Sequence, residues 1–288
     1  MKLLYLLAFF GIIPLSALAQ TNCDSLKLSG LTSSFELFQD SIAYNSLLQS
    51  KQSAFYLKNH IPARYSRASI NYQLLRGDLM AAQDANQIQL AQLSTEGSSE
   101  LGKVKLFGSL TYSKVFEDST SYGHQTRSNP SSPYYFGAPA KIHYERTTYA
   151  FQAMAGRSFW KEKLDLSLGL DYKVGSHFST NDPRGSLSEY QFDLQFVAAY
   201  NLYKDLKLGM GYSHGYGRES VNIGYKNPRY YESSAYPEFY NHLINGFREW
   251  DDALRNRIYD NKFLRNQIQL GFNNSRSNNG HSQIILWI

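Results

Sequence analysis

The sequence has a single cysteine, Cys23, and it has no long hydrophobic run after its first 19 residues. One cysteine cannot form an internal disulfide, so strand pairing and packing have to hold the fold together. Without a run of about 18 apolar residues, the chain beyond Ala19 cannot cross a membrane as a helix. The net charge of +5 is small for 288 residues, which argues against nucleic acid as a partner.

The first 19 residues have the features of a secretory signal peptide. Lys2 precedes an apolar stretch, Pro14 interrupts that stretch, and Ala17-Leu18-Ala19 forms a small-x-small cleavage site. We expect cleavage after Ala19, and an uncleaved membrane anchor is the alternative. Cys23 lies beyond the cut and not directly at it, so lipidation is not expected. The chain is therefore expected to be exported.

What the sequence does contain is strict alternation of apolar and polar residues. From Leu164 to Val174 every even position is apolar and every odd position is charged, small or hydroxylated. This period of two describes a strand with one apolar and one polar face. Nine candidate strands follow from such patterns, over residues 66–74, 86–95, 103–116, 142–159, 164–174, 190–200, 206–216, 266–273 and 281–288.

The connections between these strands alternate in length. Those at 160–163 and 201–205 are short, and those at 117–141, 175–189 and 217–265 are long, which places the long loops at one end of the sheet. The pattern predicts an all-β fold, an antiparallel transmembrane β-barrel of the outer-membrane type over residues 61–288. Residues 20–60 are expected to form a short helical or irregular periplasmic segment before it. A secreted β-sandwich or propeller is the alternative.

Several of these stretches resemble a known family. The run Leu168-Gly169-Leu170-Asp171-Tyr172-Lys173, the loop Asn181-Asp182-Pro183-Arg184 and the strand from Asp193 to Tyr200 resemble uncharacterised outer-membrane β-barrel proteins of the Bacteroidota. Together with Ile61-Pro62-Ala63 the likeness covers about residues 60–225. It implies the outer membrane of a Gram-negative bacterium. The expected partners are outer-membrane lipid, the barrel-assembly machinery and another outer-membrane protein.

The count of strands is odd, whereas a barrel with both ends in the periplasm needs an even number. The proteins that the chain resembles are also longer. The closing strand of such proteins usually ends in an aromatic residue, and Ile288 departs from this pattern. Either one weak N-terminal strand is not a true strand, or the chain is truncated at its C-terminus, and we expect truncation.

Two groups of residues are candidates for a functional site. Odd positions of the strands are expected to face the barrel lumen, and they include Lys103, Lys105, Asp165, Asp171, Lys173, Asp193 and Lys207. Their mixed charges either line a channel or neutralise each other inside a filled barrel. The second group consists of aromatic and basic residues in the loop 217–265, namely Arg229, Tyr230, Tyr231, Tyr236, Tyr240 and Trp250. These residues either bind sugars, peptides or an anionic polymer, or pack against each other over the barrel mouth.

The sequence gives little indication of catalysis. The rim candidates His177, Ser179 and Asp182 look like ordinary loop residues. The histidines lack paired metal-binding spacing. We expect no enzyme activity, no cofactor and no metal. The predicted function is that of a pore or of a barrel that presents surface loops, with a secreted β-sheet binding module and a rim-active hydrolase as alternatives.

Overall fold

The computed structural model describes residues 51–77, 85–126, 134–203, 206–245, 249–254, 257–274 and 282–287. All of them belong to the compact unit formed by residues 44–288. The expected signal peptide and the part of the expected helical or irregular segment before residue 51 lie outside the described residues. No helix among the described residues is long and apolar enough to cross a membrane.

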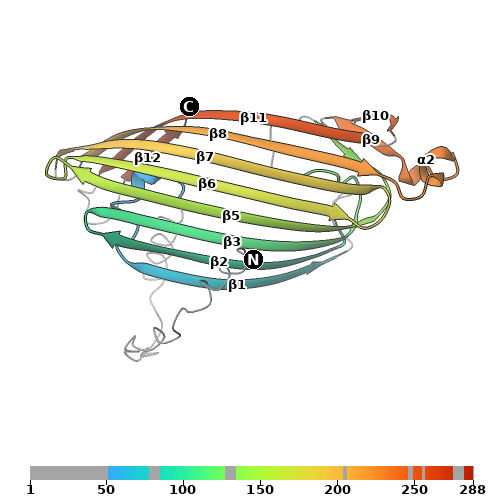
Figure 1. Cartoon of the computed structure of the whole chain (residues 1–288), viewed down its shortest axis with the longest axis horizontal. Helices are drawn as coiled ribbons and strands as arrows, with labels where there is room; N and C mark the ends of the chain where they lie inside the picture. Colours follow the sequence, from blue (N-terminus) through green and yellow to red (C-terminus); the bar gives the residue numbers. More distant parts are fainter. Residues whose placement is uncertain are drawn as a thin grey trace, which may run out of the picture. The chain divides into compact units, whose positions relative to one another are not determined.

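Nine long strands form one antiparallel sheet in which neighbours along the chain are also neighbours in space (Figure 1). They are β1 (Tyr65–Arg76), β2 (Gln87–Leu101), β3 (Val104–Thr120), β5 (Ile142–Phe159), β6 (Leu164–Ser179), β7 (Arg184–Tyr203), β8 (Leu206–Gly224), β11 (Arg257–Asn274) and β12 (Ser282–Trp287). The predicted all-β antiparallel fold is confirmed, and each of the nine expected strands is present.

A second, small sheet lies in the connections at the loop end. It has the order β10-β9-β4 and consists of β4 (Tyr134–Gly137), β9 (Asn241–Asn245) and β10 (Glu249–Leu254). The described helices are single turns, η2 (Ala54–Tyr56), α2 (Arg229–Glu232) and η3 (Pro237–Phe239). Within the described residues, β1 and β12 are the two edges of the large sheet, and no pairing joins them.

The expected loops are shorter in the structure than in the sequence prediction. The loop predicted at 175–189 is wrong, because β6 continues to Ser179 and β7 begins at Arg184. In the same way β3 continues to Thr120, β8 to Gly224, and β11 begins already at Arg257. Strict alternation of hydrophobicity ends earlier than the strands do, because polar residues such as Ser176 and Ser188 interrupt the outward face in these extensions.

The buried residues lie on one face of the sheet, in two clusters. The first packs η2 and Leu57 against Phe107, Met154 and Val197. The second contains Phe136, Ile142, Tyr144, Leu187, Val221 and Ile223. The first cluster lies near the tight turns and the second near the long connections, so one face of the sheet is covered at both ends.

Candidate functional site

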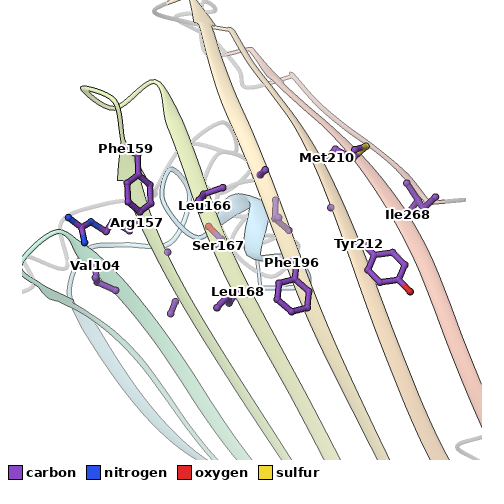
Figure 2. Close-up of a pocket in the computed structure, with 15 residues that line it drawn as sticks. Val104, Arg157, Phe159, Leu166, Ser167, Leu168, Phe196, Met210, Tyr212 and Ile268 are labelled. Carbon is purple, nitrogen blue, oxygen red and sulfur yellow. The ribbon is translucent and has the colours of Figure 1, made fainter.

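The opposite, outward face of the sheet carries large apolar side chains that stay exposed. Leu168 on β6 is the register partner of Phe196 on β7, which in turn pairs with Tyr212 on β8. These three side chains are 49%, 48% and 45% exposed. Figure 2 shows them on neighbouring strands around a shallow apolar hollow of about 740 Å³.

This apolar face has limits along the strands. On β6 the apolar face extends from Leu164 to Val174. Val174 is paired with Tyr149 on β5 and Tyr190 on β7, and these two tyrosines form an aromatic row. The next outward residue, Ser176, belongs to a polar row. Ten residue steps rise about 33 Å along a strand, and a tilt of about 45° reduces this to a height of about 23 Å. An outer-membrane barrel carries an apolar band of about 25 Å between aromatic girdles.

One group of polar side chains interrupts the outward apolar face. The hydroxyl of Tyr212 donates a hydrogen bond of 2.8 Å to Asn266 Oδ1, and His214 Nδ1 lies 2.8 Å from the same oxygen. The three residues come from β8 and β11. Their polar atoms therefore bind each other, which lowers the cost of placing them on an apolar surface.

The inward face near the tight turns is covered by residues 51–61, which we call the plug segment. Residues 51–60 were expected to precede the barrel, and the structure places them on its inner face instead. Their polar contacts reach across the sheet, from Lys51 to Glu96 on β2 (2.7 Å), from Ala54 N to Gln195 on β7 (2.7 Å), and from Ser53 to Gln269 on β11 (2.9 Å). The sheet therefore curves around this segment (Figure 1).

Phe55 of the plug segment occupies a notch of small residues. Ala199, Gly209 and Gly271 are directly paired across β7, β8 and β11. A Cβ atom on Gly209 would overlap the Phe55 ring, and one on Gly271 would lie 2.8 Å from it. The ring also lies 5.4 Å from Lys207 Nζ. Glycine is thus needed where the plug segment approaches the sheet.

Three of the expected lumen residues hold the plug segment. Lys105 is buried, and its ammonium donates to the backbone oxygens of Lys58 (3.0 Å) and Ile61. Lys207 and Asp165 form a buried ion pair with a distance of 2.7 Å between Nζ and Oδ2. Lys207 and Asp165 are paired with each other, and Lys105 is bound to carbonyl oxygens, so none of these three charges lines an open channel.

Three further expected lumen residues lie in the middle of the inward face. Asp171 and Asp193 are register partners on β6 and β7, and with Lys173 they border a polar cavity of about 310 Å³. Lys173 lies 3.5 Å from Glu189. Lys103, by contrast, is exposed in the turn between β2 and β3, so its expected lumen position is wrong. The chain reverses at this residue, and the alternation that assigns a face does not apply there.

Loop residues fill the other end of the inward face. His124 is 1% exposed, its Nδ1 binds the Tyr144 hydroxyl, and burial lowers its pKa to about 3, with a smaller contribution from the charge of Arg146. Thr126 donates to the buried carboxylate of Glu219. These contacts have no signal in the sequence, because they join loop residues to strand extensions that the alternation did not predict.

The aromatic residues of the 217–265 loop pack mainly against each other. Tyr230 stacks on Phe239 with 4.0 Å between ring centroids, and the ring of Tyr236 meets Tyr230 edge-on at 5.5 Å. The hydroxyl of Tyr240 donates to the backbone oxygen of Ser233. Of the remaining candidates, Tyr231 packs on Tyr225, Arg229 is exposed on α2, and the side chain of Trp250 lies outside the described residues.

The rim candidates for catalysis have separate contacts. His177 Nε2 lies 3.6 Å from Glu189, whereas Ser179 Oγ accepts a hydrogen bond from Gly185 N at 2.7 Å. Asp182 accepts hydrogen bonds from the backbone of the β8–β9 connection. Among the described residues, no cluster of His, Cys, Asp and Glu is arranged to hold a metal ion.

Sequence reasoning missed a pocket at the loop end, which we call the rim pocket. It has a volume of about 670 Å³ and lies between three connections, at 140–141, 180–184 and 226–239. The carboxylate of Asp182 holds two of these connections together, because it accepts hydrogen bonds from Lys226 N (3.0 Å) and Asn227 N (2.8 Å). Only Tyr230 of the expected loop residues borders it.

Comparisons with known proteins give a family and some distant structural likenesses. A family model described as a family of unknown function (DUF6850) matches residues 53–283, which extends well beyond the stretch of resemblance in the sequence. No curated protein matches the chain.

Among solved structures, the ferripyoverdine receptor of the outer membrane of Pseudomonas aeruginosa is 11% identical with a TM-score of 0.45, and the match covers 78% of this chain and 33% of that one. The ferric yersiniabactin uptake receptor of Yersinia pestis is 9% identical with a TM-score of 0.39, and the match covers 67% and 26%. The chain thus spans a third or less of these proteins.

Proposed function

The chain belongs to this family of unknown function, and we propose that it is an outer-membrane β-barrel protein of a Gram-negative bacterium that presents its loop end as a binding surface. On this proposal it is exported by a cleaved signal peptide. Its partners are the outer-membrane lipid and the barrel-assembly machinery, and it has no enzymatic activity.

The outward apolar face carries the proposal. Leu168 on β6, Phe196 on β7 and Met210 on β8 lie on this face and are 49%, 48% and 62% exposed. An aromatic row and then a polar row follow along the strands on the same face. A secreted binding module would bury such a face in protein, because contiguous apolar surface of this size is costly in water. Lipid hydrocarbon is the environment that suits it, and its height of about 23 Å fits the bilayer.

The filled inward face favours loop presentation over an open pore. The plug segment covers this face near the tight turns, and the cluster around Tyr144 and Leu187 covers it near the loops. A water-filled passage needs a continuous polar lining from end to end. Here the polar cavity beside Asp171 lies between these two packed regions.

Reconstitution of the full-length protein that carries this chain tests the proposal. In planar lipid bilayers we expect stable insertion without a steady open-channel current, with a general porin as the positive control. A steady ohmic conductance would support the pore instead. Recovery of the protein in the aqueous fraction after membrane flotation would support the secreted module.

A further inference from the structure

We infer that the rim pocket binds an acidic saccharide, a sugar ring that carries a carboxylate or a phosphate group. The proposal goes beyond loop presentation because it assigns a site and a class of ligand. It rests on three properties of the pocket, namely a fixed frame, an excess of unpaired positive charge, and polar and aromatic side chains around one cavity.

The frame of the rim pocket is fixed by hydrogen bonds between its three connections. Asp182 is 8% exposed and binds the backbone of Lys226 and Asn227. The backbone nitrogen of Ala140 donates a hydrogen bond of 2.8 Å to Glu238 O, and this bond joins the connection before β5 to the η3 turn. A site held in this way loses little conformational entropy when a ligand binds.

The charges around the pocket do not cancel. Asp182 already accepts a hydrogen bond from Arg184 Nε at 3.0 Å, in addition to its two backbone donors. Within the described part of the chain, no hydrogen bond or ion pair uses the ammonium groups of Lys141 and Lys226, and both residues are exposed. Glu238 is the remaining carboxylate. Arg184 and Asp182 offset each other, so the two unpaired lysines remain with the single carboxylate of Glu238 around the pocket, and this excess of positive charge favours an anionic ligand.

The other walls suit a sugar ring better than a bare anion. Thr180, Asn181 and Asn227 supply hydroxyl and amide groups, which both donate and accept hydrogen bonds as sugar hydroxyls require. Tyr230, supported by its stack on Phe239, adds an aromatic wall. The volume of about 670 Å³ lies within the range of about 300–1,000 Å³ of small-molecule sites.

Calorimetry on the full-length protein in detergent tests this inference. The probes are tetragalacturonate, which carries one carboxylate on each ring, and its methyl ester, which has the same rings without the charge. We expect tetragalacturonate to bind at least tenfold more tightly, and its affinity to fall with added salt. Equal binding of the two probes, or no binding of either, would overturn the proposal.

Substitutions assign the binding to the rim pocket. Lys141→Gln and Lys226→Gln remove the charges but leave the backbone bonds of the frame, and each should weaken tetragalacturonate binding by about tenfold. Lys161→Gln, in an exposed turn at the other end of the sheet, is the matched control and should have no effect. If all three variants bind equally well, the rim pocket is not the site.

Galactose 6-phosphate and inorganic phosphate separate the two kinds of acidic group and the role of the sugar. Binding of galactose 6-phosphate would extend the site to phosphorylated sugars, in agreement with the proposal. Binding of inorganic phosphate as tight as that of the sugars would contradict it, because the ring would contribute nothing. These measurements need no bilayer, so their failure leaves the proposed membrane location untouched.

Discussion

At the scale of single residues, glycines on the inward face decide where the chain can pass over the sheet. Gly209 is the clearest case, because any side chain there would enter the volume of the Phe55 ring and also approach Ala199. Gly224 lies on the same strand and has nothing within 4 Å of an added Cβ atom. The two residues form a matched pair on β8.

Gly209→Ala should displace Phe55 and destabilise the protein by about 1–3 kcal/mol, the usual cost of an overpacked core. Gly224→Ala should change the free energy of unfolding by less than about 0.5 kcal/mol. Urea unfolding in detergent measures both. Limited trypsin digestion gives a local readout, because cleavage after Lys58 should become faster in Gly209→Ala alone. Equal stability of the two variants would argue against the notch.

A buried histidine makes the loop end sensitive to acid. His124 has a pKa of about 3 in the folded chain, and an unfolded histidine has a pKa of about 6.5. Below pH 6.5 the unfolded state binds a proton that the folded state excludes, so stability is lost as the pH falls from about 6.5 towards 3. The protection of residues 121–126 against hydrogen exchange, expressed relative to the intrinsic exchange rate at each pH, should therefore fall from pH 7.5 to pH 4.5.

His124→Gln replaces the titrating ring by a neutral amide and should show a smaller pH dependence of exchange in the same residues, after correction for the intrinsic exchange rate. Its stability at pH 7.5 is expected to be lower, because the contact with the Tyr144 hydroxyl is altered. A variant with the same pH dependence as the unaltered protein would assign the acid sensitivity to other groups.

At the scale of elements, the strands extend beyond the apolar band, and one strand offers a direct test. Leu168 and Ser176 lie on the same outward face of β6, the first inside the band and the second above it. Leu168→Arg should cost about 2–4 kcal/mol near the middle of the bilayer, whereas Ser176→Arg should be nearly neutral. Unfolding from lipid vesicles measures both, and equal costs would contradict the membrane position of the band.

The sequence predicted the strands where a bilayer-facing side alternates with a polar side, and it failed where this contrast ends. Above Val174 the outward residue Ser176 and the inward residues His177 and Ser179 are all polar, so the contrast between the two faces is lost although the ladder with β7 continues to Phe178. Backbone hydrogen bonding continues a strand beyond the residue at which the alternation of apolar and polar side chains ends.

The plug segment and the rim pocket could not be predicted from the sequence, for related reasons. The plug segment has no strong period of its own, and the notch that receives Phe55 is visible only when Gly209 and Gly271 are known to be register partners. The rim pocket is held by Asp182, which joins two connections, and by the bond from Ala140 N to Glu238 O, which joins the third; the backbone groups in these bonds leave no pattern in the sequence.

At the scale of the whole molecule, the proposal fixes which end of the sheet faces the outside of the cell. In a background with Cys23→Ser, a cysteine at the exposed position Ser234 should react with an impermeant maleimide on intact cells. A cysteine at Lys161, in the turn between β5 and β6, should react only after the outer membrane is opened. The reverse pattern would show an inverted orientation, and labelling of both on intact cells would argue against a spanning barrel.

The contact between Ser53 and Gln269 also bears on the order in which the molecule assembles. The two residues are 216 positions apart in the chain, and the notch for Phe55 is complete only when β11 has paired with β8. The plug segment therefore docks only after β11, one of the last strands of the chain, has paired with β8. Contacts between residues far apart in the chain form slowly, so docking of Phe55 is a late step of folding. The time at which Lys58 becomes resistant to trypsin would measure when this step is complete.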